Sequence, residues 1–135
     1  CVLDLDTVMP GLSAYDFGDS IRFGAATAAE DEKDLSKMEM DLELFGACVR
    51  GFLEAATSLT DKEVEVLPLG AYTITLEQAT RFLKDYLDGD VYFKTAYDDH
   101  NLVRARTQIK LVQDMEKKMD EMNAIVAKVA AEVRK

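Results

Sequence analysis

The sequence predicts a mainly α-helical protein with one short β segment at its N-terminus. Apolar residues recur at three- and four-residue steps through most of the chain, as they do on the buried faces of helices. A capping box stands at Thr60-Asp61-Lys62-Glu63, and an apolar run, Cys1-Val2-Leu3, opens the chain. The 135 residues, 48% of them hydrophobic, suffice for one domain with a core, so we do not expect a disordered chain.

The opening β segment ends in two carboxylates, Asp4 and Asp6, one residue apart. Because side chains alternate along a strand, both carboxylates point to the same face. Mg²⁺ prefers oxygen ligands in near-octahedral geometry, and carboxylates at the end of a buried strand supply them. We expect Asp4 to be the principal metal ligand. Asp6 then binds a second metal or orients the loop that follows, and the alternative for Asp4 is a carboxylate that caps a turn.

A strand needs neighbours to satisfy its backbone, and no residue precedes this one. We therefore expect the chain to be the C-terminal piece of a larger enzyme.

The charge of the chain excludes several classes of partner. Its formal net charge is −10, and nucleic acids and anionic membrane surfaces both require basic patches. No apolar run reaches transmembrane length, and no signal peptide is present, so we expect a cytoplasmic protein. The two cysteines, Cys1 and Cys48, are too few to indicate a disulfide framework.

Helices are predicted in order along the rest of the chain. The first covers 15–23, and an acidic connector over 25–40 follows without an assigned structure. An amphipathic helix over 42–57 is next. The helix that begins at the capping box is interrupted at Pro68, and another runs over 69–87.

The turn at Asp88-Gly89 ends that helix, and Asp98 or Asp99 caps a last helix that runs to the C-terminus. The later half of the last helix repeats apolar residues at three- and four-residue steps. These residues are Met115, Met119, Met122, Val126, Val129 and Val133. The repeat predicts either a coiled-coil seam or a long helix laid across the domain, and we favour packing on the parent enzyme.

The opening motif resembles that of the aminoglycoside phosphotransferase and choline kinase family, relatives of the protein kinases. Leu3-Asp4-Leu5-Asp6 is similar to the family's metal-binding strand, and Tyr15-Asp16-Phe17-Gly18-Asp19 is similar to the start of its next helix. The N-acetylhexosamine 1-kinases show a closer resemblance. It runs through 5–11, 81–87, 89–94 and 100–106 and reaches nearly the whole chain apart from its C-terminal end.

The resemblance implies the helical C-terminal lobe of a protein-kinase-like fold. In that reading, 1–24 hold the metal-binding strand, its loop and the first helix, 41–98 form the acceptor-binding part, and 99–135 form a long C-terminal helix. The catalytic aspartate is then expected upstream of this chain. Asp16 is expected to support the catalytic loop by accepting hydrogen bonds from its backbone, rather than to bind the metal.

The activity implied is ATP- and Mg²⁺-dependent transfer of a phosphoryl group to a small hydroxylated acceptor. The resemblance points to an N-acetylhexosamine, phosphorylated on its anomeric hydroxyl. ATP would be held mainly by an N-terminal lobe, so this chain alone is expected to be inactive. For the acceptor we single out Arg81 and Tyr92. Arg81 interrupts an apolar helix, and we expect a buried guanidinium that needs partners, whereas the ring of Tyr92 can stack on a sugar. The alternatives are a structural Arg–Asp pair and a core tyrosine.

Two other functions stay open. The chain could be a stand-alone acidic helical module that dimerises through an exposed apolar surface or through the C-terminal helix, or a degenerate kinase relative without catalysis. The single histidine, His100, is expected to be structural, because a lone histidine is no metal site.

Overall fold

The computed structural model describes Leu5 and residues 8–134, and this part of the chain is mainly α-helical, as the sequence predicts. Its elements are α1 (Ser13–Gly24), the short 3₁₀ turn η1 (Leu35–Lys37), α2 (Leu42–Ala55), α3 (Asp61–Glu65), α4 (Leu67–Leu87) and α5 (His100–Val133). Among the described residues there is no β-strand, only an isolated bridge between Ala26 and Met40. The expected β segment, with Asp4 and Asp6, lies outside the described residues apart from Leu5, which is in no strand.

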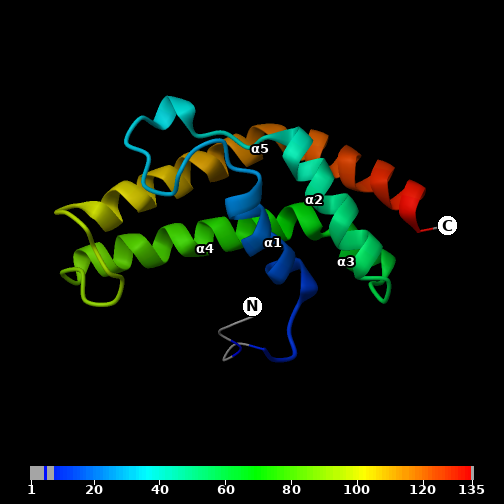
Figure 1. Cartoon of the computed structure of the whole chain (residues 1–135), viewed down its shortest axis with the longest axis horizontal. Coiled ribbons are helices and arrows are strands. Elements are labelled where there is room, and N and C mark those ends of the chain that lie inside the picture. Colours follow the sequence, from blue (N-terminus) through cyan, green and yellow to red (C-terminus); the bar gives the residue numbers. More distant parts are fainter. Residues whose placement is uncertain (1–4, 6–7, 135) are drawn as a thin grey trace.

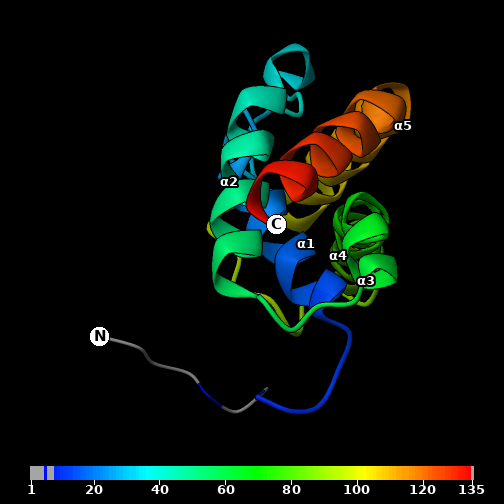
Figure 2. The same cartoon turned by 90° about the vertical axis from the view of Figure 1, so that its right-hand side faces the viewer.

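The two longest helices, α4 and α5, lie side by side along the long axis of the molecule, and the shorter helices pack against them (Figure 1). Figure 2 shows α1 between α2 and α4. The core forms where these helices meet. Its largest fully buried side chains include Phe17, Ile21, Phe45, Leu53, Leu111, Met115 and Met122.

The apolar repeat of the C-terminal helix belongs to this core. Met115, Met122, Val126 and Val129 are buried, and α5 packs on α2, α3 and α4. We expected the repeat to pack on another part of a larger enzyme. Instead, the chain's own helices cover it.

One predicted helix cap is present in the structure, and another is not. Thr60 and Glu63 form the predicted capping box. The break between α3 and α4 falls at Val66, so Pro68 lies in the first turn of α4. Proline is tolerated there because the N–H group that it lacks has no partner within the helix. Asp99 occupies the N-cap position of α5, but its side chain makes no capping hydrogen bond.

Two glycines allow α1 and α4 to cross at close range. A Cβ atom added to Gly18 would lie 2.6 Å from the carbonyl oxygen of Gly70, and one added to Gly70 would overlap the carbonyl of Ala14. The backbones therefore touch at this crossing, which fixes how α1 is placed on α4.

The acidic connector over 25–40 is held against α5 by buried polar contacts. The carboxylate of Asp114 accepts from the backbone N–H of Met40 at 2.7 Å, and the Lys118 ammonium donates to the carbonyl of Met40 at 2.8 Å. Glu30, in the middle of the connector, pairs with Arg22 of α1 and lies 3.6 Å from the Arg104 guanidinium of α5. The connector is thus part of the packed fold. No described helix is both long enough and apolar enough to cross a membrane.

Candidate functional site

Asp85 organises the loop that joins α4 to α5. Its side chain is buried, with 4% of the residue exposed. One carboxylate oxygen accepts from the backbone N–H groups of Val91 at 3.1 Å and Tyr92 at 2.8 Å. The other accepts from the N–H of Phe93 and from the side-chain amide of Asn101, both at 2.9 Å. Four donors from the loop and from α5 thus converge on one carboxylate.

The same amide of Asn101 closes the turn of the loop. It also donates to the carboxylate of Asp90 at 2.8 Å. Gly89 and Asp90 have φ angles of 92° and 59°, in the left-handed region, where glycine is unstrained and aspartate is tolerated better than most residues. The loop therefore reverses direction within a few residues of the end of α4 and presents its next residues to solvent.

The hydrogen bonds also set the protonation of Asp85. Burial acts to raise the pKa of its carboxyl group. The N–H groups of Phe93, Tyr92 and Val91 outweigh that effect, so the pKa lies below its ordinary value. The group is ionised at neutral pH, as an acceptor of four hydrogen bonds must be.

A pocket of about 400 Å³ lies between the end of α4 and this loop. It is lined by Arg81, Lys84, Asp85, Asp88, Val91, Tyr92 and Phe93. The Arg81 guanidinium carbon lies 5.8 Å from the ring centre of Tyr92 and 5.4 Å from that of Phe93, within cation–π range. Phe93 in turn packs on Phe82 of α4, with ring centres 4.8 Å apart.

The structure thus brings together Arg81 and Tyr92, the two residues that the sequence singled out for an acceptor. Neither is buried, however. The Arg81 side chain is 44% exposed and pairs at 3.7 Å with Glu77, and Tyr92 is 73% exposed. The expectation of a buried guanidinium was therefore wrong, and so was the alternative of a core tyrosine. An exposed cation beside an exposed aromatic ring is an arrangement that can contact a polar ligand on both its hydroxyl groups and its apolar face.

Asp16 lies in the first turn of α1 and is exposed. It borders a second pocket, of about 660 Å³, between the segment 8–13 and the end of α2 at Phe52 and Ala56. Its support of a catalytic loop stays a prediction. Asp4 and Asp6 lie outside the described residues, and within the described part no three histidine, cysteine or carboxylate side chains are grouped so as to hold a metal ion.

His100 has the structural place expected of it. It is buried at the start of α5, and its Nδ1 accepts from the backbone N–H of Ala96 at 3.1 Å. Its ring stacks on Tyr97, and its Nε2 lies 3.3 Å from the carboxylate of Asp31. These contacts link the connector to the beginning of α5.

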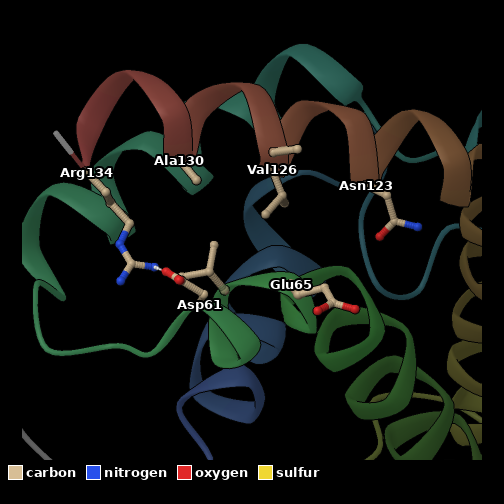
Figure 3. A pocket seen from close by; sticks show the side chains of 8 residues that line it. Asp61, Glu65, Asn123, Val126, Ala130 and Arg134 are labelled. Atoms are coloured by element: carbon tan, nitrogen blue, oxygen red, sulfur yellow. Dashed lines mark ion pairs between the residues drawn. The ribbon is translucent and has the colours of Figure 1, made fainter.

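A further pocket of about 660 Å³ opens between α3 and the end of α5 (Figure 3). Its wall is largely apolar, with Val64 and Val126, and its rim carries Asp61 and Arg134, which form an ion pair at 3.4 Å. Arg134 also donates to the carbonyl oxygen of Leu59, and Glu65 pairs with Lys62 outside the pocket. The pocket contains none of the residues that the sequence predicts for a site. We therefore place the candidate site at the end of α4.

Asp85, Phe93 and Asn101 complete the candidate site but were not predicted. A signal for Asp85 exists in the sequence. It falls in the last turn of a predicted helix, where the helix dipole disfavours a carboxylate unless nearby donors compensate. A scan of the chain against models of known protein families finds none that matches.

Proposed function

We propose that this chain is the helical, acceptor-binding part of an ATP- and Mg²⁺-dependent phosphotransferase. Its acceptor is a small hydroxylated molecule, an N-acetylhexosamine, whose anomeric hydroxyl receives the phosphoryl group. The sequence resemblance supplies the reaction. The pocket at the end of α4 supports the acceptor, because Arg81 and Tyr92 come from different elements and lie together there.

The pocket suits a sugar in size and chemistry. Its volume of about 400 Å³ lies within the roughly 300–1,000 Å³ typical of small-molecule sites. In this proposal, Tyr92 stacks on the apolar face of the sugar ring. Arg81 donates hydrogen bonds to a hydroxyl or to the N-acetyl carbonyl, and Asp88 accepts from a second hydroxyl. Such contacts fix the acceptor hydroxyl in place, which is most of what a protein contributes to phosphoryl transfer.

The remaining parts of the reaction rest on the resemblance. Asp4 and Asp6 would hold Mg²⁺, which neutralises phosphate charge when bound. Asp16 would hold the catalytic loop, and an N-terminal lobe would bind ATP and supply the catalytic aspartate. We accordingly expect the 135-residue chain to bind the acceptor but not to turn over ATP.

Acceptor binding can be tested on the chain itself. We expect saturation-transfer NMR to detect N-acetylglucosamine or N-acetylgalactosamine on the wild-type chain, with choline and an aminoglycoside as comparison ligands. Arg81→Gln and Tyr92→Ala should each weaken binding by about tenfold, the loss expected when one good polar or stacking contact is removed. Lys62→Gln, at an exposed position on α3, is the matched control and should bind as the wild type does.

Catalysis requires the full product of the gene. We expect it to phosphorylate an N-acetylhexosamine with ATP and Mg²⁺, and Asp4→Ala to abolish that turnover. Turnover of choline or the aminoglycoside instead would retain the reaction and reject the sugar. An absence of turnover on the whole panel would reject the phosphotransferase and favour a non-catalytic relative of the kinases.

A further inference from the structure

The imidazole of His100 joins three parts of the molecule at the start of α5. It is buried, with 5% of the residue exposed. On one side, its Nδ1 accepts from the backbone N–H of Ala96, in the loop that joins α4 to α5, at 3.1 Å. On the other, its Nε2 lies 3.3 Å from the carboxylate of Asp31 in the connector. The ring also stacks on Tyr97, with ring centres 4.4 Å apart. We call this set of contacts the histidine latch.

The hydrogen bond from Ala96 fixes which ring nitrogen carries the proton. A neutral imidazole has one donor nitrogen and one acceptor nitrogen. Since Nδ1 accepts, the single proton of the neutral ring lies on Nε2, on the side of Asp31. Among the described residues Nε2 has no hydrogen-bond partner, so Asp31 is close to it but not aligned as an acceptor. A second proton can therefore be added only at Nδ1.

Protonation of the ring breaks its contact with Ala96. Both nitrogens of an imidazolium are donors, so Nδ1–H would then point at the N–H of Ala96. Two donors form no hydrogen bond, and a polar group that is kept from water without a partner is costly. His100 is also the first residue of α5, where the positive end of the helix dipole disfavours a cation. The charged ring is therefore incompatible with the closed latch.

The charged and titratable groups around the latch act on the ring in both directions. Asp31 favours an imidazolium, but its side chain is 47% exposed, so solvent screens the attraction. Lys33 opposes an imidazolium, because its ammonium lies 4.4 Å from the centre of the Tyr97 ring on which His100 stacks.

Two further charges lie near Tyr97 and the start of α5. Burial and the Asp31 carboxylate raise the pKa of the Tyr97 hydroxyl, and the Arg104 guanidinium acts against them. Arg104 is itself 3.6 Å from Glu30, and Asp99 lies beside Tyr86 of α4. Charges of both signs thus surround the ring and oppose one another, whereas the loss of the hydrogen bond from Ala96 is complete.

We propose that the histidine latch is a pH-sensitive switch, which holds residues 94–99 against the start of α5 at neutral pH and releases them in mild acid. Imidazole is the side chain whose charge ordinarily changes between about pH 5 and 8. Neutral His100 accepts from Ala96 and keeps the latch closed. The stabilisation is therefore complete at the upper end of this range and is lost as the pH falls.

The other end of the loop does not respond in this range. The N–H of Tyr92 donates to the carboxylate of Asp85 at 2.8 Å, and the pKa of that carboxyl lies below its ordinary value. Asp85 therefore stays ionised in mild acid and continues to hold its end of the loop. The loop thus has two anchors, and only the one at His100 is released near neutral pH.

NMR of the 135-residue chain tests the tautomer first. His100 is the only histidine, so the ¹⁵N signals of its ring nitrogens are unambiguous. At about pH 7.5 we expect the proton on Nε2 and the chemical shift of an acceptor nitrogen at Nδ1. A proton on Nδ1 in the neutral ring would overturn the proposal.

Amide hydrogen exchange then tests the switch. Exchange at Ala96, corrected for the intrinsic pH dependence of exchange, should accelerate by about tenfold between about pH 7.5 and 5.5, the effect of losing one hydrogen bond. Exchange at Tyr92 should stay unchanged over the same range. An unchanged rate at Ala96 would overturn the proposal, whether or not the ring gains a proton. An equal acceleration at Tyr92 would overturn it as well, because the whole loop would then open through another group.

His100→Asn is the matched control. Its Oδ1 is bonded to Cγ as Nδ1 is in histidine, so it can accept from Ala96 but gains no proton in this range. We expect exchange at Ala96 in this variant to be the same at both pH values. His100→Ala removes the acceptor, and Ala96 should then exchange at the faster rate at both.

Circular dichroism at both pH values checks that the variants remain helical, and the wild-type comparison stands without them. A His100→Asn protein that responds to acid as the wild type does would assign the response to another group and overturn the proposal. None of these results depends on whether the chain binds a sugar.

Discussion

Asp85 lies in the last turn of α4, where the negative end of the helix dipole disfavours a carboxylate. The four hydrogen bonds from Val91, Tyr92, Phe93 and Asn101 offset this cost. Since three of these donors are consecutive backbone N–H groups, the carboxylate fixes the path of the loop. Asp85 is therefore a positioning residue for Tyr92 and does not need to touch a ligand.

We expect Asp85→Asn to release the loop while leaving the helices folded. Asparagine puts an NH₂ group in place of one carboxylate oxygen. That group is a hydrogen-bond donor, so it cannot accept the two hydrogen bonds that the oxygen accepts in the wild-type protein. Amide hydrogen exchange at Val91, Tyr92 and Phe93 should accelerate by at least about tenfold, the effect of losing a charge-assisted hydrogen bond. Asp88→Asn, at the exposed end of the same helix, is the control. Unchanged exchange in the Asp85 variant would contradict the positioning role.

Acid should open the same loop in the wild-type protein. Because the pKa of Asp85 is lowered in the folded state, its contribution to loop stability is complete above the ordinary pKa of about 4 and is lost as the pH falls toward the lowered value. Exchange at Tyr92, corrected for the intrinsic pH dependence of exchange, should therefore rise only below about pH 4. Opening near pH 6 would point to another group.

Sequence motifs were enough to bring Arg81 and Tyr92 into one hypothesis, and the structure places them in one pocket. The burial of Arg81 was mispredicted because a long side chain can leave an apolar helix face and put its charged head in water. Asp85 and Asn101 were missed because their partnership spans 16 residues and depends on how the loop folds back.

At the scale of the elements, the α1–α4 crossing depends on two glycines whose backbones touch. We expect Gly70→Ala to lower the free energy of unfolding by about 3 kcal/mol, because the new methyl group forces apart backbones that cannot yield. Gly51 provides the matched control, since a Cβ added there meets nothing within 4 Å. Gly51→Ala should instead stabilise the protein by about 0.5–1 kcal/mol through helix propensity. Urea unfolding monitored by circular dichroism measures both, and equal effects would contradict the close crossing.

The helices themselves were predictable because each carries its own periodicity and end signals, such as the capping box at Thr60 and Glu63. The connector over 25–40 was not predictable. Its position depends on contacts such as that between Met40 and Asp114, which are 74 residues apart, and no local pattern specifies such a pair.

At the scale of the whole molecule, α5 is the helix that contacts the largest number of other elements, namely η1, α2, α3 and α4. It packs along α4, covers α2 and contacts α3, and its buried apolar residues from Leu111 to Val129 belong to one core. The sequence could show that its methionines and valines form a stripe, but a stripe does not reveal what covers it. Here the cover is formed by helices from earlier in the same chain.

A single core makes a further expectation testable, namely that both ends of the molecule unfold together. Of the five tyrosines, Tyr86 lies in the last turn of α4, and Tyr92 and Tyr97 lie in the loop between α4 and α5. Met122 lies in the second half of α5. Met122 is fully buried, and Met122→Ala should lower the free energy of unfolding by about 3 kcal/mol, as truncations of buried methionines do. Tyrosine fluorescence and circular dichroism should then report the same lowered midpoint, because one cooperative transition moves all probes equally. Met9→Ala, at an exposed methionine, should change the free energy of unfolding by less than about 0.5 kcal/mol. If the tyrosine signal kept its wild-type midpoint while the helical signal shifted, the loop end would be a separate folding unit, and α5 would not couple the candidate site to the rest of the core.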